Sequence, residues 1–560
     1  MNFVTKEPIN KGWSSDKKYC VTDENGTRYL LRVSDIAQHD TKQSEFNMMK
    51  QVASFGVPMC QPIEFGTCED GVYSIQSWID GEDAEQVMSG YSDTEQYVYG
   101  LEAGRILRNI HSIPAPASQE DWEIRFNRKM DYKIKKYVEC PIKYENGQAF
   151  IDYINENRHL LKNRPQVYQH GDYHIGNMMI DRGGQLHVID FNRNDYGDPW
   201  EEFNRIVWCA QKAPLFASGM VNGYFDNNVP MEFWRLLALY ISSNTLSSVY
   251  WAIPFGQDEV NTMLNQAKEV LSWYDNMRNL VPTWYFKGYY LQYIDGIPFK
   301  LKSTFDFSFM KEYGTVFKVY DDQDSGNICF GTEKDGQRYF VKFAGAPTEQ
   351  YGGDPADAIS RLKATLPIYS DLKHENLIEL IEAKEIGAGF AMVFKWADGD
   401  CMGRMYPAAY RRFIQLPIND RLAVFSDILS FLECVVSRNY VAIDFYDGSI
   451  MYDFVNGKTT ICDIDLFRKQ PCVNDMGHMW GSSRFQSPEE YQLGADIDEV
   501  TNVYTIGATA FALFGEYNRT REKWQLSDKL FEIATRAVSD DRANRQQTIR
   551  QFTAEWEAAQ

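Results

Sequence analysis

The stretch His170–Asn177, which reads HGDYHIGN, and the four residues Val188–Phe191, which read VIDF, are the most informative part of this chain. They place Asp172, Asn177 and Asp190 within one short segment. Apolar runs precede and separate these polar residues, as expected when the ends of strands present side chains to a cleft. A lone His-x-Asp would be interpreted as a polar loop between strands, but the spacing of all three residues favours a chemical site.

Phosphoryl transfer requires this combination of side chains. One carboxylate orients the acceptor hydroxyl, while an amide and a second carboxylate hold Mg²⁺ on the phosphates of the nucleotide. Asp172 fits the first role, and Asn177 and Asp190 fit the other two. The tripeptide Gly-Asp-Pro (one-letter GDP) at Gly197–Pro199 follows closely. We therefore predict a kinase-type site in which Asp172 is catalytic and Asn177 and Asp190 are metal ligands.

A zinc site is the alternative for this segment, because His170 and His174 are four residues apart and could share one face of a helix. However, Gly171 and Gly176 make the segment a poor helix, and no glutamate follows the first histidine. Zinc is therefore not expected here.

The first half of the chain resembles the aminoglycoside phosphotransferase family of small-molecule kinases. That family carries H-x-D-x-x-x-x-N, then I-D-F, then G-D-P followed by acidic residues, and the matching stretches here read HGDYHIGN, VIDFNRNDYGDP and WEEFNR. The resemblance implies ATP or GTP as donor, Mg²⁺, and a small-molecule acceptor bound by the helical part. Asp195, Glu201 and Glu202 follow the metal-binding aspartate closely, so we expect them to line the acceptor pocket.

The resemblance extends upstream into a predicted lobe of strands. Tyr19–Val21 and Tyr29–Val33 flank the turn DENG and are expected to pair. In the family, a lysine on such a strand pairs with a glutamate of the next helix, and the residues here are Arg32 and Glu45. Arginine is a planar fork and lysine a point charge, but both are cationic. We therefore predict that Arg32 meets both Glu45 and the nucleotide.

The second half repeats this order of motifs, with several motif residues replaced, and resembles eukaryotic-type Ser/Thr protein kinases. YFVKF places Lys342 where that family has its phosphate-contacting lysine. AIDFYDGS matches H-R-D-x-x-x-x-N, with Asp444 kept and Ser449 in place of the asparagine. The metal-binding aspartate would be Asp465 in IDLF or Asp463 in ICDI, and both assignments stay open.

Other features of this second family are unevenly kept. SPEEY and DDRANR correspond to its A-P-E and D-P-x-x-R motifs, so Glu489 and Arg545 are expected to form a buried pair. Only Gly326 occupies a position of the glycine-rich loop, and Thr365 aligns with the helical glutamate that would pair with Lys342. Each lost electrostatic contact typically costs about 10²-fold in rate. The second domain is therefore predicted to be a pseudokinase or a weakly active kinase.

Length and composition agree with two domains. The chain has 560 residues, of which 44% are hydrophobic, enough to fill two sizeable cores. We expect an α+β protein of two tandem protein-kinase-like folds, each with a β-rich N-lobe and a helical C-lobe. The expected boundaries are 1–285 for the first domain, 286–304 for a connecting hairpin around Asp295-Gly296, and 305–560 for the second. Since no flexible Gly/Ser linker intervenes, we expect the two domains to pack together.

Charge and cysteine usage limit the possible partners. The 57 basic and 78 acidic residues give a net charge of −21, which argues against binding nucleic acid or an anionic membrane. An acidic surface could attract a cationic acceptor such as an aminoglycoside, but it is equally compatible with other acceptors. Ten cysteines without C-x-x-C pairs, no apolar signal core and no apolar run of about 18 residues predict a cytoplasmic protein.

These features predict a nucleotide-dependent O-phosphotransferase that acts on a hydroxyl of a small molecule, either antibiotic-like or a metabolite, with a regulatory or structural second domain. One alternative is a Ser/Thr protein kinase whose second domain is active. Another is a non-catalytic protein that binds nucleotide or a partner. Retention of Asp172, Asn177 and Asp190 favours the first hypothesis. The identity of the acceptor and the oligomeric state stay open, because related folds share a phosphate site and differ in their pocket loops.

Overall fold

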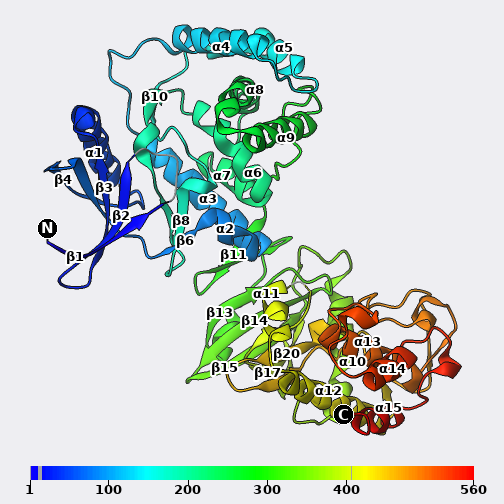
Figure 1. Ribbon diagram of the computed structural model, residues 1–560. Coiled ribbons are helices and arrows are strands. Elements are labelled where there is room, and N and C mark those ends of the chain that lie inside the picture. The colour runs from blue at the N-terminus through cyan, green and yellow to red at the C-terminus, as the bar shows by residue number, and fades with distance from the viewer. Residues whose placement is uncertain (1, 11–15, 405) are drawn as a thin grey trace. The chain divides into compact units, whose positions relative to one another are not determined.

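The computed structural model describes residues 2–10, 16–404 and 406–560. The chain divides into two compact units, Met1–Tyr289 and Tyr290–Gln560 (Figure 1). Each unit combines a small antiparallel sheet with a larger, mainly helical part, which makes the protein α+β. Within the described ranges, every helix is too short or too polar to span a lipid bilayer.

The first unit begins with an antiparallel five-stranded sheet in the order β1-β2-β3-β5-β4. Its strands are β1 (Phe3–Ile9), β2 (Lys17–Asp23), β3 (Arg28–Ser34), β4 (Pro62–Cys68) and β5 (Gly71–Ser77). Helix α1 (His39–Ser54) joins β3 to β4 and packs against β4 and β5. Phe46, Met49 and Val52 recur every three residues, so they form one apolar face, and all three are buried. This sheet and helix position Arg32 and Glu45.

The remainder of the first unit is mainly helical. Its helices are α2 (Ala84–Val87), α3 (Asp93–Ile110), α4 (Trp122–Glu139), α5 (Gln148–Asn157), the short 3₁₀ helix η6 (Glu201–Arg205), α6 (Ile206–Lys212), α7 (Pro214–Tyr224), α8 (Met231–Ala252) and α9 (Gln257–Trp273). Helices α3 and α7 approach closely because glycines face each other. A Cβ atom on Gly104 would lie 2.1 Å from the carbonyl oxygen of Met220, so no larger residue fits there.

Two small sheets in this helical part carry the HGDYHIGN and VIDF motifs. Strands β6 (Gly81–Asp83), β8 (Met178–Asp181) and β9 (Leu186–Val188) form one sheet in the order β6-β8-β9. Strand β7 (Val167–Gln169) pairs with β10 (Asp195–Gly197). The first motif therefore lies between β7 and β8, and the second begins at the end of β9.

The second unit repeats the strand order of the first. Its strands are β11 (Tyr290–Ile294), β12 (Ile297–Leu301), β13 (Thr315–Tyr320), β14 (Asn327–Lys334), β15 (Gln337–Ala344), β16 (Leu380–Ile386), β17 (Gly389–Lys395), β18 (Asp400–Cys401), β19 (Tyr440–Val441), β20 (Ile450–Asp453), β21 (Lys458–Ile461), β22 (Arg468–Lys469), β23 (Cys472–Val473) and β24 (Asp496–Ile497). The five-stranded sheet runs β13-β14-β15-β17-β16, and a three-stranded sheet runs β18-β20-β21. Both orders match those of the first unit.

The helices of the second unit also follow this pattern. They are α10 (Pro355–Asp371), α11 (Pro407–Ile414), α12 (Ile418–Ser437), α13 (Glu499–Phe514), α14 (Asp528–Ala537) and α15 (Ile549–Glu557). Helix α10 joins the third and fourth strands of its sheet, as α1 does in the first unit. The hairpin β11–β12 precedes this sheet and turns at Asp295 and Gly296, which both have positive φ angles. It belongs to the second unit, since the division falls after Tyr289.

Candidate active site

Backbone hydrogen bonds hold Asp172, Asn177 and Asp190 in one place. The side-chain amide of Asn177 donates to the carbonyl oxygen of Asp172 at 2.9 Å. The N–H of Ile189 donates to the carbonyl oxygen of Asn177 at 3.0 Å. Asp190 follows directly, with a left-handed φ of 68° that ends the extended backbone of β9. The three residues proposed from sequence therefore come from one linked segment.

Two buried side chains fix the loop that precedes Asp172. The His170 ring nitrogen Nε2 lies 3.0 Å from the carbonyl oxygen of Ile189, so it carries a proton and donates. Burial lowers the pKa of His170, which keeps this ring neutral. The N–H of Gly171 donates to Glu202 Oε1 at 2.9 Å. Both contacts act on the position of Asp172.

Asp172 is held as a carboxylate by cations. Its Oδ1 lies 3.2 Å from Arg205 Nε, and its Oδ2 lies 3.7 Å from Arg193 Nη1. Burial acts to raise the pKa of Asp172, but His174 and the two arginines outweigh that effect and hold it well below its ordinary value. The group is therefore ionised at neutral pH and can accept a hydrogen bond from a hydroxyl.

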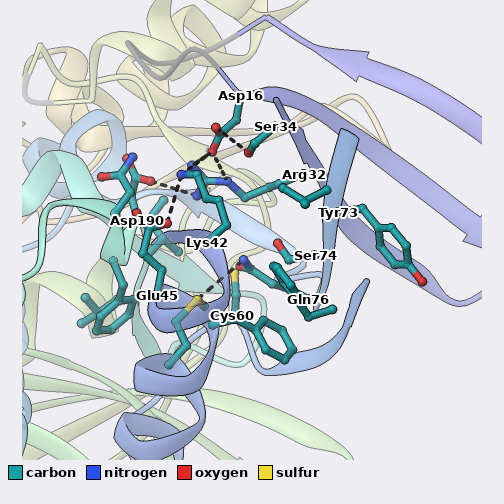
Figure 2. A pocket seen from close by; sticks show the side chains of 18 residues that line it. Asp16, Arg32, Ser34, Lys42, Glu45, Cys60, Tyr73, Ser74, Gln76 and Asp190 are labelled. Atoms are coloured by element: carbon teal, nitrogen blue, oxygen red, sulfur yellow. Dashed lines mark hydrogen bonds and ion pairs between the residues drawn. The ribbon is translucent and has the colours of Figure 1, made fainter. Parts of the chain in front are cut away.

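Arg32 on β3 binds two carboxylates on opposite sides (Figure 2). Its Nη2 and Nε atoms lie 2.9 and 3.2 Å from Asp16 Oδ2, and its Nη1 lies 3.1 Å from Asp190 Oδ1. Asp16 is only 3% exposed and also accepts a bond from Ser34 Oγ at 2.8 Å. Burial acts to raise the pKa of Asp16, but Arg32 and Ser34 lower it overall.

The expected ion pair between Arg32 and Glu45 is wrong. Glu45 pairs with Lys42, one turn earlier on α1, at 3.0 Å. The reason is that Asp16, immediately before β2, occupies the guanidinium fork of Arg32. Figure 2 shows Glu45 and Lys42 on the helix side of a cavity that Arg32 and Asp190 also line. The role of Asp16 could not be predicted from the sequence, because Asp16 lies outside the motifs and contacts Arg32 only in the folded chain.

A second cation lies beside Arg32. Lys18 on β2 is the direct cross-strand neighbour of Arg32 on β3. Burial lowers the pKa of Lys18, and the positive charge of Arg32 acts in the same direction while Asp190 and Asp16 oppose it. The two strands therefore bring two positive side chains next to the carboxylate of Asp190.

The three carboxylates expected in the acceptor pocket have separate roles. Asp195 is 59% exposed and lies 3.3 Å from Arg125 Nη1. Glu201 accepts from Gln169 Nε2 at 3.2 Å and lies 3.5 Å from Lys129 Nζ. Glu202 is the exception to the expectation, since its side chain is 1% exposed and binds the backbone of the catalytic loop. Glu202 holds the backbone just before Asp172, and its side chain is too buried to line an open pocket.

Sequence reasoning missed the role of Asp198 in the GDP tripeptide. Its fully buried carboxylate accepts from Arg164 Nε and Nη2 at 2.6 and 3.0 Å and from Tyr240 Oη at 2.6 Å. Its backbone oxygen accepts from Gln169 at 2.8 Å. The tripeptide was recognised as part of a motif. Its contacts with Arg164 and Tyr240 could not be predicted, because these residues are distant from Asp198 in the sequence.

The second unit repeats the bond that links Asn177 to VIDF. The N–H of Cys462 donates to the carbonyl oxygen of Ser449 at 2.8 Å. Asp463 therefore corresponds to Asp190, and the two share positive φ angles of 55° and 68°. This register favours Asp463 over Asp465, which lies two residues later, as the counterpart of the metal-binding aspartate.

Lys342 on β15 lies between these two aspartates. Its Nζ is 3.0 Å from Asp463 Oδ1 and 2.6 Å from Asp465 Oδ2. The group from α10 that reaches this site is Tyr369, whose hydroxyl donates to Asp465 at 3.0 Å. Tyr369 lies one turn after Thr365, and the alignment of Thr365 with the helical glutamate stays a prediction. Thr365 instead bonds to a carbonyl of its own helix.

The counterpart of Asp172 in the second unit has the opposite electrostatic surroundings. Burial raises the pKa of Asp444 to about 7, and the negative charges of Asp463, Glu490 and Asp324 add to this shift. Ser449 replaces the asparagine, and its buried hydroxyl makes no hydrogen bond within the described ranges. The groups that shift the pKa of Asp444 are therefore acidic, whereas those around Asp172 include two arginines, and a serine stands in place of the amide.

Two structural contacts of the second unit are strong. Arg545 donates from Nη1 and Nη2 to the carboxylate of Glu489 at 2.7 and 3.0 Å, and both side chains are buried, which confirms the expected pair. Asn502 accepts from the N–H of Ala442 at 2.9 Å and donates to its carbonyl oxygen at 2.8 Å. The loop before Asp444 is therefore held in place by the side chain of Asn502.

A family of known proteins matches part of the first unit. Residues 5–236 match the model of the phosphotransferase enzyme family, APH. One similar structure is the apo form of a thermostable mutant of aminoglycoside phosphotransferase APH(4)-Ia, with 15% identity over 48% of this chain and 94% of that one, and a TM-score of 0.37. Ternary complexes of two further variants, with ADP and hygromycin B and with AMP-PNP and hygromycin B, have 16% identity, the same coverage, and TM-scores of 0.36 and 0.38. No curated protein matches the chain.

Proposed function

Because residues 5–236 match the phosphotransferase enzyme family, we propose that the first unit transfers a phosphoryl group from ATP or GTP to a hydroxyl of a small molecule. The observation that carries the proposal is the bonded chain from Asp172 through Asn177 to Ile189, which precedes Asp190. It joins a base, an amide and a carboxylate, the set that phosphoryl transfer requires.

In this proposal Asp172 accepts a hydrogen bond from the acceptor hydroxyl and aligns its oxygen with the phosphorus atom. The charges of Arg205 and Arg193 keep Asp172 ionised for that role. Arg32 and Lys18 supply positive charge for the phosphates, and Arg32 exchanges its contact with Asp190 for phosphate oxygens.

The oxygen donors of Asn177 and Asp190 fit Mg²⁺, which proteins bind through one or two such ligands completed by phosphates and water. The amide nitrogen of Asn177 is committed to Asp172, which leaves its oxygen for a cation. The described ranges contain no cluster of three or more His, Cys, Asp or Glu residues suited to a metal, so most ligands would come from the nucleotide and water. When bound, Mg²⁺ would neutralise charge that develops on the phosphates.

We infer further that the second unit is a kinase-like domain with a regulatory or structural role. The repeated strand orders, the position of Lys342 and the pair of Glu489 with Arg545 support the relationship. Ser449 in place of an asparagine and the raised pKa of Asp444 support weak chemistry or none.

Calorimetric titration of nucleotide into the full-length protein, with and without Mg²⁺, tests the division of roles. Asp172→Asn should bind MgATP or MgGTP like the wild type, whereas Asp190→Ala should lose the Mg²⁺-dependent part of the affinity. In an assay of ADP or GDP release with a panel of alcohols, Asp172→Asn should be slower by roughly 10²–10⁴-fold. Equal loss of nucleotide binding in both variants would overturn the assignment.

A further inference from the structure

Helix α4 presents a stripe of cations to the candidate active site. Arg125, Lys129 and Lys133 are spaced four residues apart, so they share one face of the helix. Arg125 lies 3.3 Å from Asp195 and also donates to the backbone beside it. Lys129 lies 3.5 Å from Glu201. The first two cations of the stripe therefore neutralise two of the carboxylates expected to hold an acceptor.

Lys133 completes the stripe and is different. It is half-buried, and in the part of the chain that the structure describes no carboxylate lies within 4.0 Å of its ammonium group. Burial, assisted by the positive charges of Lys129 and Arg205 and opposed by Glu201, lowers the pKa of Lys133 to about 7. A cation that is partly desolvated among like charges favours an anion beside it.

Two more cations approach from the side of Asp172. Arg205 is 26% exposed and Arg193 is 51% exposed, and the carboxylate of Asp172 is the acidic group that both contact. Lys133 is near enough to Arg205 for the positive charge of Arg205 to lower the pKa of Lys133. Two positive side chains thus contact the catalytic carboxylate and a third lies beside Arg205, although the whole chain carries a charge of −21. The positive charge is local and lies where the acceptor must reach Asp172.

We propose that the acceptor carries an anionic group, a carboxylate or a phosphate, that is bound by Lys133, Arg193 and Arg205 while its hydroxyl lies on Asp172. This inference rests on the proposed phosphotransfer function and specifies its substrate class. Guanidinium forks bind carboxylate and phosphate oxygens in pairs, which fixes orientation as well as charge. A cationic aminoglycoside would be repelled at this position, so of the acceptors left open by the sequence the anionic ones are favoured.

Turnover tests the proposal with alcohols of matched size and different charge. The full-length protein with MgATP or MgGTP is offered hydroxy acids and sugar phosphates, their neutral amides and polyols, and amino alcohols. Transfer should be confined to the anionic set. Lys133→Met should raise the Michaelis constant for an anionic acceptor by about 10-fold or more, with the constant for nucleotide unchanged. Lys133→Arg should restore much of the affinity.

Lys135→Met is the matched control, because Lys135 is on the same helix but 73% exposed and pairs with Glu139. It should behave like the wild type. Transfer only to amino alcohols or neutral alcohols, with no effect of Lys133→Met, would overturn the proposal.

A second measurement separates the anion site from phosphotransfer itself. Sodium sulfate is titrated against the full-length protein saturated with a non-hydrolysable nucleotide, and the thermal midpoint is followed. Sulfate should stabilise the wild type, Lys133→Arg and Lys135→Met, and it should stabilise Lys133→Met several-fold less at equal concentration. Equal responses of wild type and Lys133→Met would overturn the anion site even if an alcohol is phosphorylated. A difference without any turnover would support the anion site and count against phosphotransfer.

Discussion

Asp172 and Asp444 show how neighbours decide the state of a carboxyl group at corresponding positions. Asp172 lies beside His174, Arg205 and Arg193, which together outweigh burial and hold its pKa well below the ordinary value. Asp444 is half-buried near Asp463 and other carboxylates, and this burial and these charges raise its pKa to about 7. The first is an ionised acceptor of hydrogen bonds at neutral pH, and the second is largely protonated below that pH.

The raised pKa of Asp444 predicts a pH-dependent stability. Its carboxyl group is protonated in the folded state up to about pH 7 but ionises from about pH 4 in the unfolded chain. The contribution of Asp444 to the free energy of unfolding is therefore fully present below about pH 4 and is lost as the pH rises towards 7. Asp444→Asn removes this loss, so its gain in denaturation midpoint over the wild type should grow from pH 5 to pH 8 without divalent cations. A gain that is constant with pH would contradict the assignment.

Arg32 carries a second prediction at this scale. Arg32→Ala would remove the nearest cation of the buried Asp16, which keeps Lys42 at 3.3 Å, so the cost should be at or below the value of about 3–5 kcal/mol that is typical of a broken buried pair. The denaturant midpoint for unfolding of the first unit should decrease, and the Michaelis constant for nucleotide should rise. Arg32→Lys should recover part of both losses. Glu45→Gln is the control and should change stability by less than about 1 kcal/mol, because Glu45 lies in a partly exposed pair with Lys42.

At the scale of elements, local pattern was the reliable guide and distant contacts were not. The paired strands β2 and β3, the apolar face of α1 and the hairpin β11–β12 follow from turn residues and periodicity. The contact of Asp16 with Arg32 and that of Arg164 with Asp198 could not be predicted, since each joins segments that only the folded chain brings together. The contact of Tyr369 with Asp465 could not be predicted either, because a helix leaves its register against a neighbouring strand open by a turn.

The pair of Glu489 with Arg545 braces η10 (Pro488–Tyr491) against the segment before α15. Arg545→Ala should lower the stability of the second unit by about 3–5 kcal/mol, because it leaves Glu489 buried with a weaker cation. Arg542→Ala is the control, since Arg542 contacts the same Glu489 but is 31% exposed, and its effect should be clearly smaller. Denaturation followed by tryptophan fluorescence measures both, and equal effects would show that the brace does not depend on burial.

Across the whole molecule, the two units share strand orders but not polar chemistry. The first has the amide of Asn177 and an ionised Asp172, and the second has Ser449 and a carboxyl group in an acidic, buried setting. Packing and a few buried pairs, such as that of Glu489 with Arg545, maintain a fold independently of any reaction. The motifs identify the replacement of asparagine by Ser449, whereas the different charges around Asp172 and Asp444 could be recognised only in the structure.

The most direct test of this account is one measurement of phosphoryl transfer to a small-molecule alcohol by the full-length protein and two variants. With radiolabelled MgATP or MgGTP, Asp172→Asn should reduce transfer by roughly 10²–10⁴-fold, and Asp444→Ala should leave it unchanged. Protein-bound label is counted in the same samples. Transfer that survives Asp172→Asn, or label on a protein substrate that disappears with Asp444→Ala, would contradict the assignment of catalysis to the first unit.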